Sequence, residues 1–326
     1  MSRKLEALAV ACSNIALVKY WGKSERGNNL TRVPSLSMTL DALRTRTRVR
    51  FAEDSLEDRV SIGGELVSGR PRERVVALLD KLRARAGLTL HAEVESVNDF
   101  PTASGLASSA SGFAALALAA QAALGLGLGP REVSALARES SASAARSVFA
   151  GFVELLAEAE AASELAAPDF MDVMMLVAAT SLGEKATSSS SGMLHTQATS
   201  PFYPAWVEGA PALFEAAKRA LGARDLEALG AAMERSTWMM HGSMLAANPP
   251  LFYLRGATLR VIEAVHALRK AGTLAFYTMD AGPHVKILTT PAEAPRVEAA
   301  VRELPGVVRV IPSRPGPAAF LVNEGS

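Results

Sequence analysis

The sequence has little net charge, few aromatic residues and a single cysteine. Its 34 Lys and Arg face 33 Asp and Glu, so no overall field favours nucleic acid or an anionic membrane surface as a partner. Aromatic residues make up only 6% of the chain, and no basic surface rich in them is evident. Cys12 alone excludes an internal disulfide or a multi-cysteine metal site and favours a reducing compartment. These features predict a cytoplasmic protein that binds neither nucleic acid nor a membrane.

Long apolar runs are also absent. None reaches the roughly 18 to 20 residues needed to cross a bilayer. The N-terminus has basic residues before an apolar stretch, but that stretch is short and continues directly into Lys19-Tyr20-Trp21-Gly22-Lys23, so we reject a signal peptide. With 49% hydrophobic and 21% charged residues, the composition is that of a globular protein. A length of 326 residues predicts two domains with a cleft between them.

Hydrophobic patterning predicts a mixed series of strands and helices. We expect a strand or strand pair at 5–18 and further strands at 35–40, 44–51, 88–97, 171–180, 274–279, 285–289 and 307–311. Helices are expected at 73–86, 106–124, 131–138, 144–162, 205–221, 225–245, 258–271 and 292–303, with a Ser-rich loop at 187–191. Pro168 interrupts the pattern. The order predicts an α+β fold with domains at 1–175 and 176–326.

Arginines alternate with other residues between positions 44 and 51. A period of two places Arg44, Arg46, Arg48 and Arg50 on one strand face. An RNA-binding stripe and a solvated sheet face both fit this pattern, and we favour the solvated face.

The segment from Pro101 to Ala110 follows a predicted strand and opens a long predicted helix. Helix starts offer unpaired N–H groups and a positive dipole end, so small residues there allow the backbone to approach a triphosphate. Ser108 and Ser109 could instead act only as helix caps. The segment lacks the Lys of a Walker loop and the GxGxxG of a dinucleotide fold, which disfavours both families.

Four blocks in a fixed order carry a resemblance to a known family. They read NIALVKYWGK from Asn14, FPTASGLASSASG from Phe100, SASAARS from Ser141 and TMDAGP from Thr278. The chain resembles the diphosphomevalonate decarboxylases of the GHMP kinase superfamily, and SPFYPAW from Ser200 and MLAANPP from Met244 extend the similarity. The resemblance implies a ribosomal-protein-S5-domain-2-like N-terminal lobe and a ferredoxin-like C-terminal lobe, with the active site in the cleft between them.

The resemblance also implies a reaction. The family transfers the γ-phosphoryl group of ATP to the C3 hydroxyl of mevalonate 5-diphosphate, so that phosphate leaves in place of hydroxide. The C1 carboxylate then departs as carbon dioxide, and the product is isopentenyl diphosphate. ATP and Mg²⁺ are the implied cofactors, the metal ligands stay unassigned, and a homodimer is expected.

Three catalytic residues follow from the match to the family's motifs. Asp280 would lie near the C3 hydroxyl as a base or an orienting acceptor, and would stabilise positive charge at C3. Arg146 would hold the substrate carboxylate through its fork of donors, and Lys19 would face the reacting centre. Considered singly, each has an ordinary structural alternative: a turn aspartate, an exposed helix arginine and a loop lysine.

The remaining implied contacts involve the phosphates and the nucleotide. The expected substrate-binding residues are Tyr20, Lys23, Ser141, Ser143, Arg146 and Ser189. The expected cofactor-binding residues are Ser96, Asn98, Gly105, Leu106, Ala107, Ser108 and Ser109.

Two positions depart from the family pattern. Ser190 stands where many bacterial members have an Arg that helps hold the terminal diphosphate, which keeps the 5-monophosphate open as a substrate. His284 replaces the Asn of the Asp-Ala-Gly-Pro-Asn turn, and we assign it no catalytic role. A kinase that stops after phosphorylating C3 is a further alternative, because a fold does not determine function.

Overall fold

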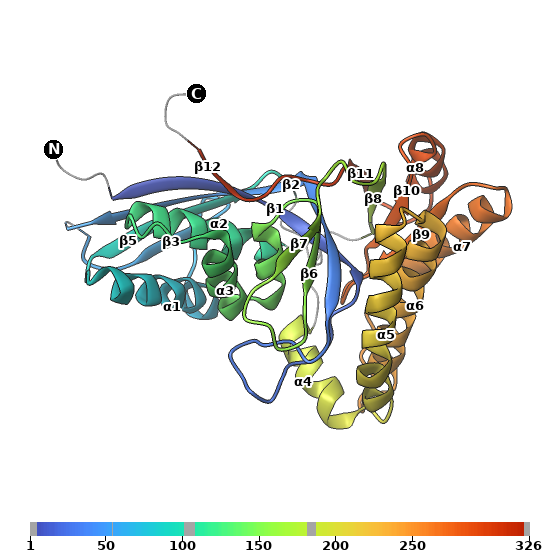
Figure 1. Ribbon diagram of the computed structural model, residues 1–326, viewed down its shortest axis with the longest axis horizontal. Coiled ribbons are helices and arrows are strands. Elements are labelled where there is room, and N and C mark those ends of the chain that lie inside the picture. The colour runs from blue at the N-terminus through green and yellow to red at the C-terminus, as the bar shows by residue number, and fades with distance from the viewer. Residues whose placement is uncertain (1–4, 54, 101–107, 181–186, 323–326) are drawn as a thin grey trace.

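The computed structural model describes residues 5–53, 55–100, 108–180 and 187–322. Two β-sheets lie side by side in it, each with helices packed on it (Figure 1). The strands are β1 Glu6–Val18, β2 Ser35–Ala52, β3 Arg59–Ile62, β4 Glu65–Leu66, β5 His91–Asn98, β6 Phe152–Leu155, β7 Ser163–Ala166, β8 Met174–Ala179, β9 Ala275–Met279, β10 Val285–Thr289, β11 Arg309–Ser313 and β12 Phe320–Val322. The helices are α1 Gly69–Ala86, α2 Ser108–Ala123, α3 Pro130–Ser140, the 3₁₀ helix η1 Ala142–Val148, α4 Ser189–Thr199, α5 Tyr203–Gly222, α6 Leu226–Leu245, α7 Gly256–Lys270 and α8 Ala294–Arg302.

The first sheet has the order β12-β1-β2-β5-β3-β4, and β6 and β7 extend it from β2. Its longest strands, β1 and β2, pair antiparallel over most of their length. Helices α1, α2 and α3 cover one face (Figure 1). Apolar side chains from β2, β5, α1 and α2, such as Val49, Val94, Leu79 and Leu116, fill the core between the sheet and these helices.

The opposite face of β2 carries the alternating arginines. Thr45, Thr47, Val49 and Phe51 are buried, whereas the four arginines between them are exposed or half-buried, so the predicted alternation is confirmed. Arg48 forms a 2.6 Å ion pair with Glu6 on β1, and Arg50 forms a 2.8 Å ion pair with Glu93 on β5. Acidic side chains on neighbouring strands therefore form ion pairs with two of the four arginines.

The second sheet has the order β11-β8-β10-β9 and is antiparallel throughout. With helices between β8 and β9 and between β10 and β11, this is the βαββαβ order predicted for the ferredoxin-like lobe. Met175 and Val177 of β8 belong to the core formed with α5 and α6. Leu176 and Ala178 belong to the core formed with α7 and α8 on the other face. Each strand therefore alternates between two apolar layers.

Helices α5 and α6 also connect the two sheets. Ile15 and Leu17 of β1 and Met38 of β2 share a core with Phe214 of α5 and Met233 of α6. This shared core brings the end of β1 close to the turn after β9.

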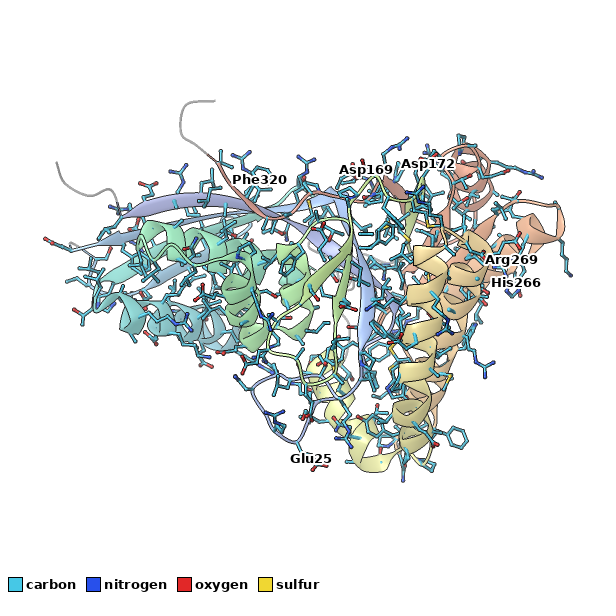
Figure 2. All side chains as sticks on the ribbon, viewed as in Figure 1. Glu25, Asp169, Asp172, His266, Arg269 and Phe320 are labelled. Atoms are coloured by element: carbon cyan, nitrogen blue, oxygen red, sulfur yellow. The ribbon has the colours of Figure 1, made fainter. Side chains whose placement is uncertain are left out.

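The C-terminal segment returns to the first sheet. Pro315 forms a β-bridge with Leu40, and β12 pairs antiparallel with β1 through Leu8 and Val322. Figure 2 shows Phe320 of this strand above the first sheet. The boundary at 175/176 stays a prediction. No helix in the described part of the chain combines the length and hydropathy of a membrane span.

Three predicted elements differ from the structure. The helix expected at 144–162 is wrong: η1 ends at Val148, and β6 and β7 follow. Gly151 turns the chain with a φ of +59°, and β6 then pairs with β2, so tertiary pairing overrides a helix-favouring composition. The strands expected at 35–40 and 44–51 are one strand, β2. The Ser-rich loop contains the first turn of α4, capped by Ser188.

Candidate active site

Asp280 lies at the start of the turn between β9 and β10, with its carboxylate held between two lysines. Lys19 Nζ donates to Oδ1 at 2.6 Å, and Lys286 Nζ donates to Oδ2 at 2.8 Å. The Lys19 and Lys286 side chains are 1% and 0% exposed, whereas that of Asp280 is 30% exposed. We call these three residues the Lys-Asp-Lys cluster. Both lysines are covered by protein, and the carboxylate is the part that solvent or a ligand can reach.

Charge and burial shift the acidities within the cluster. Burial opposes ionisation of Asp280, but the charges of Lys19 and Lys286 outweigh it and hold the pKa of Asp280 well below its usual range. Burial lowers the pKa of Lys19 to about 8, although the Asp280 charge acts in the opposite direction. The carboxylate is therefore ionised at neutral pH and weakly basic, and Lys19 titrates just above neutrality.

Helix α6 fixes the positions of both strands that contribute to the cluster. The backbone N–H of Lys19 donates to Ser236 Oγ at 2.9 Å. At the next residue of the helix, Thr237 Oγ1 lies 2.8 Å from Thr278 Oγ1 of β9, within hydrogen-bond distance. His241 is buried on the same helix, and burial lowers its pKa to about 4, so it is neutral beside the lysine. The cluster therefore depends on packing between the two halves of the chain.

Arg146 lies on η1 and is 2% exposed. Its Nη1 donates to Ser35 Oγ at 2.9 Å, and its Nε donates to Asn14 Oδ1 at 3.3 Å. Burial lowers the pKa of Arg146 to about 10, which leaves it charged at neutral pH. No Asp or Glu in the described ranges forms an ion pair with it, so its charge is available to an anionic ligand.

A cavity of about 650 Å³ is lined by Tyr20, which follows Lys19 in the chain. Burial raises the pKa of Tyr20, and the charge of Arg146 lowers it. Tyr20 and Lys23 line it from the segment after β1, and Ser141 and Ser143 line it from the start of η1. Ser188, Ser189 and Ser190 line it from the start of α4. Its polar walls therefore supply hydroxyl groups and cations, the donors that phosphates accept hydrogen bonds from. We call this the polar cavity.

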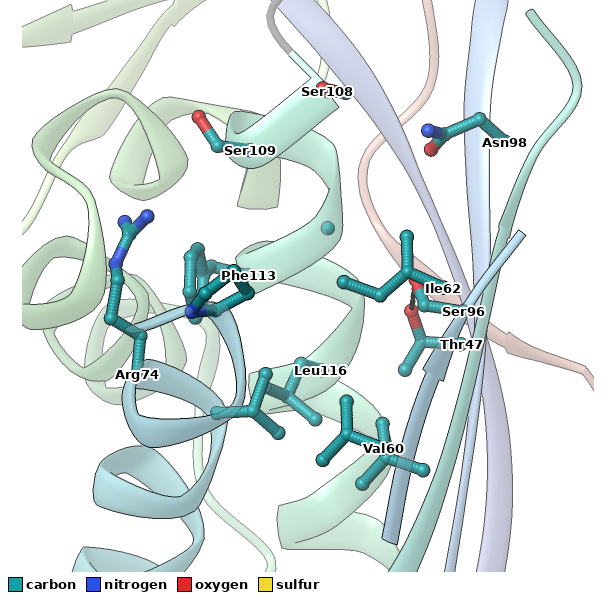
Figure 3. Close-up of a pocket in the computed structure, with 14 residues that line it drawn as sticks. Thr47, Val60, Ile62, Arg74, Ser96, Asn98, Ser108, Ser109, Phe113 and Leu116 are labelled. Atoms are coloured by element: carbon teal, nitrogen blue, oxygen red, sulfur yellow. Dashed lines mark hydrogen bonds between the residues drawn. The ribbon is translucent and has the colours of Figure 1, made fainter. Parts of the chain in front are cut away.

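A second cavity, of about 210 Å³, lies between β5, α1 and the start of α2. Figure 3 shows Ser108, Ser109 and Arg74 at one end, and Val60, Ile62 and Leu116 at the other. Ser96, Asn98 and Thr47 line its strand side, where Thr47 Oγ1 and Ser96 Oγ lie 3.0 Å apart. An apolar end and a polar end suit the two ends of a nucleotide. We call this the apolar cavity.

The two cavities adjoin. Pro71, Arg74 and Ser109 line both of them, so a ligand in one can meet a ligand in the other at this junction.

Most of the predicted site residues lie together. Lys19, Asp280 and Arg146 form one charged centre, in which each charge affects the pKa of a neighbour. The substrate-binding predictions other than Arg146 line the polar cavity, and Ser96, Asn98, Ser108 and Ser109 line the apolar cavity. The predicted Gly105, Leu106 and Ala107 lie outside the described residues.

Sequence reasoning missed Lys286. The sequence feature that could have indicated it is a charged residue between Val285 and Ile287, in a short apolar strand that is buried along its whole length. The Nδ1 atom of His284, to which we assign no catalytic role, accepts a hydrogen bond from the backbone N–H of Thr180 at 3.1 Å.

Comparisons with known proteins identify the family of the chain. Residues 11–166 match the diphosphomevalonate decarboxylase-like N-terminal domain, and residues 175–310 match the mevalonate 5-diphosphate decarboxylase C-terminal domain. The chain is 36% identical to the diphosphomevalonate decarboxylase of Debaryomyces hansenii over 86% of this chain and 78% of that protein. It is 33% identical to the phosphomevalonate decarboxylase of Haloferax volcanii over 97% of this chain and 98% of that protein.

Solved structures share the fold. The structure of MDDEF in complex with MVAPP, AMPPCP and magnesium is 36% identical, with a TM-score of 0.91 over 97% of this chain and 98% of that one. The α+β fold is therefore the predicted GHMP kinase fold. With both halves matched by domain models of one family, the chain belongs to the diphosphomevalonate decarboxylase family.

Proposed function

We propose that this protein catalyses the ATP-dependent decarboxylation of mevalonate 5-diphosphate to isopentenyl diphosphate, with release of ADP, phosphate and carbon dioxide. The observation that carries the proposal is the Lys-Asp-Lys cluster with Arg146, whose neighbours Tyr20 and Ser143 line the polar cavity, together with the apolar cavity that adjoins it. This arrangement suits a transfer between a nucleotide and a small anionic substrate. We infer the identity of the substrate from the family to which the chain belongs.

ATP occupies the apolar cavity in this proposal, with its phosphates directed to the junction at Ser109 and Arg74. Ser96, Asn98 and Ser108, together with the predicted Gly105, Leu106 and Ala107, make up its binding site. Magnesium neutralises phosphate charge when it is bound, and it usually needs only one or two protein ligands besides phosphates and water. Hydroxyl groups at the start of α2 fit that requirement.

The substrate occupies the polar cavity. Tyr20, Lys23, Ser141, Ser143 and Ser189 bind its phosphates through hydroxyl groups and one ammonium group. Arg146 binds the C1 carboxylate, because a guanidinium donates two parallel hydrogen bonds to a carboxylate and so fixes its orientation. These contacts place the C3 hydroxyl against Asp280.

Phosphoryl transfer comes first and elimination second, and the proton that the C3 hydroxyl loses in the first step ends on the phosphate released in the second. The C3 oxygen forms a bond to the γ-phosphorus while the bond from that phosphorus to ADP breaks. The C3–O bond then breaks with phosphate as the leaving group, and the electrons of the C1–C2 bond form the C2=C3 double bond as carbon dioxide leaves. Positive charge develops at C3, where a carboxylate stabilises it.

The Lys-Asp-Lys cluster supports one of the two roles expected for Asp280. A general base works best with a pKa near the operating pH, and the two lysines hold the pKa of Asp280 far below that. Asp280 therefore acts as the acceptor that orients the C3 hydroxyl and as the anion facing C3. Lys19 and Lys286 fix the carboxylate so that it does not reorganise during the reaction.

The 5-monophosphate remains the second candidate substrate. Ser190 offers a hydroxyl where many family members have an Arg, and the relative in Haloferax volcanii is named a phosphomevalonate decarboxylase. The diphosphate is favoured because both domain models and the relative in Debaryomyces hansenii are named for it. A 3-kinase is less favoured because Asp280, Lys19 and Arg146 occur together.

The test measures ADP and carbon dioxide separately, with magnesium, ATP and either mevalonate 5-diphosphate or mevalonate 5-phosphate. Equal release of both products from the diphosphate alone is the expected result, and Asp280→Ala should abolish it. Carbon dioxide from the monophosphate would favour the second candidate, and ADP without carbon dioxide would indicate a kinase. Absence of both products with both substrates would refute the proposal.

We further propose that the protein acts as a homodimer in the cytoplasm. The family resemblance supports the dimer, and a single, buried cysteine supports a reducing compartment. Sedimentation of the purified chain tests the oligomeric state: a monomer across micromolar concentrations would contradict it.

A further inference from the structure

The loop 23–31 follows β1 and carries Lys23 into the polar cavity. A β-bridge between Lys23 and Thr31 closes its ends, and Figure 2 shows Glu25 at its outer end. Lys23 and Asn29 line the polar cavity, and Lys23 Nζ donates to Asn29 Oδ1 at 2.9 Å. The position of the ammonium group in the cavity therefore depends on the position of Asn29.

Two residues of this loop adopt a backbone conformation that side chains disfavour. Asn28 and Asn29 have φ angles of +50° and +54°, in the left-handed region. Asn tolerates this region better than most residues, but such a conformation persists only where surrounding contacts hold it. The turn at these two residues therefore depends on contacts from outside the loop.

The C-terminal end of α3 supplies those contacts. Arg138 Nη1 donates to the carbonyl oxygen of Asn28. The side-chain amide of Asn29 donates to the carbonyl oxygen of Glu139 at 2.5 Å. Arg138 Nε also donates to the carbonyl oxygen of Glu160, between β6 and β7, at 2.7 Å. One guanidinium therefore ties the turn of the loop both to α3 and to the segment between β6 and β7.

The environment of Arg138 is that of a structural cation and not of a ligand contact. Its side chain belongs to a residue that is 2% exposed, and within the described structure it lines neither cavity. Its Nη2 lies 4.0 Å from Glu139 Oε1, at the limit of an ion pair, and Glu139 pairs more closely with Lys81. Burial lowers the pKa of Arg138, because the interior disfavours its charge. Its short hydrogen bonds are directed at the main chain that it holds.

We propose that Arg138 is a positioning residue, which holds the loop 23–31 in the conformation that places Lys23 in the polar cavity. This inference rests on the proposed function, in which Lys23 binds substrate phosphates. A loop released from α3 populates other conformations, and the apparent affinity for substrate falls in proportion to the competent fraction. The bound state itself is unchanged. The loss should therefore appear in KM and not in kcat.

Steady-state kinetics of Arg138→Met test the proposal. Met keeps an unbranched apolar side chain and removes the donors to both carbonyl oxygens. We expect the KM for mevalonate 5-diphosphate to rise about 10-fold or more, the loss typical of hydrogen bonds from a charged group, while kcat and the KM for ATP change less than about threefold. Arg138→Lys should recover part of the loss, because an ammonium can still bind one carbonyl oxygen. Arg131→Gln removes an exposed charge from the first turn of the same helix and is the matched control.

Tryptic cleavage after Arg26 provides a second readout, which reports the loop directly and needs no turnover. The side chain of Arg26 is 68% exposed, so opening of the backbone limits its cleavage. Arg138→Met should be cleaved there about 10-fold faster than the wild type, with the site identified by fragment mass, and saturating mevalonate 5-diphosphate should slow the cleavage again. Asn29→Gly keeps the left-handed backbone but removes the contact with α3, so it should show the same KM and cleavage effects. It tests the same connection if Arg138→Met does not fold.

Equal cleavage rates in the wild type, Arg138→Met and Asn29→Gly would overturn the proposal. A kcat that falls as much as the KM rises would also overturn it, because that result indicates general damage to the site. Failure of the proposed function is a separate outcome. If the chain decarboxylates neither substrate, protection of the loop by inorganic pyrophosphate in the wild type and its loss in Arg138→Met would still support positioning by Arg138.

Discussion

Substitution of Lys286 by Met is the most direct test of the Lys-Asp-Lys cluster. The side chain is fully buried between Val285 and Ile287, so Met fits an apolar strand while removing one of the two cations on Asp280. The remaining ion pair with Lys19 keeps the carboxylate partnered, so we expect the variant to fold. Thermal denaturation should confirm that the variant is folded before kinetics are compared.

The expected shifts have definite signs. Burial is the main cause that lowers the pKa of Lys19 to about 8, and the charge of Lys286 lowers it further, whereas the charge of Asp280 raises it. Removing it should raise the pKa of Lys19, so the alkaline fall in kcat moves to higher pH. Asp280 loses one of two adjacent cations, and one such contact shifts a carboxyl pKa by about 1 to 3 units. At about 1.4 kcal/mol per pKa unit, the ionised form of Asp280 loses roughly 1.4 to 4 kcal/mol of stabilisation.

The assay is the pH dependence of kcat with saturating ATP and substrate. We expect the wild type to lose activity as pH rises through about 8, where Lys19 gives up its proton. Lys286→Met should lower kcat about 10- to 100-fold through looser positioning of the carboxylate, and should shift the alkaline limb upward. Lys270→Met, an exposed change at the end of α7, should leave the profile unchanged. An alkaline limb at the same pH in wild type and Lys286→Met would refute the coupling of the two lysines.

Further predictions concern binding, backbone strain and support of the site. Arg146→Lys should raise the substrate KM about 10-fold or more in steady-state assays, because an ammonium lacks the fork, and full recovery of KM would contradict this. Gly22→Ala should lower the melting temperature, with a cost of about 1 to 3 kcal/mol, because φ is +116° and a Cβ would lie 2.0 Å from Tyr203 Oη. Gly27→Ala, with φ +75° and open space around it, should cost less. Ser236→Ala should reduce kcat with little change in the KM for ATP, because the backbone N–H of Lys19 loses the Ser236 hydroxyl as its acceptor. An unaltered kcat would argue against positioning by α6.

Periodicity predicted the fold well where one face of an element is buried. Strand β10 and helices α6 and α7 lie within two residues of their predicted bounds, because apolar spacing reports burial directly. The prediction failed at 144–162, where small helix-forming residues occupy a segment whose structure is decided by pairing with β2. Local propensity contains no information on such a distant partner.

The site could be predicted only through the family resemblance. Lys19 and Asp280 are 261 positions apart, and their contact depends on α6 packing against both β1 and β9. Residue type and spacing alone fitted a loop lysine and a turn aspartate equally well. Lys286 was missed because a single Lys in a short strand usually faces solvent, and only the two-sided packing of β10 buries it.

The charge balance of the site connects its structure with its substrates. Lys19, Lys286 and Arg146 are buried cations, and Asp280 is the one carboxylate that pairs with any of them in the described structure. Burial of unpaired charge destabilises a fold, so the charge of Arg146, which pairs with no carboxylate in the described ranges, is costly to bury. A substrate with a carboxylate and a diphosphate, together with the transferred phosphoryl group, supplies the missing negative charge. Lys23, which lines the polar cavity, extends this argument from the reacting carbon to the phosphates of the substrate.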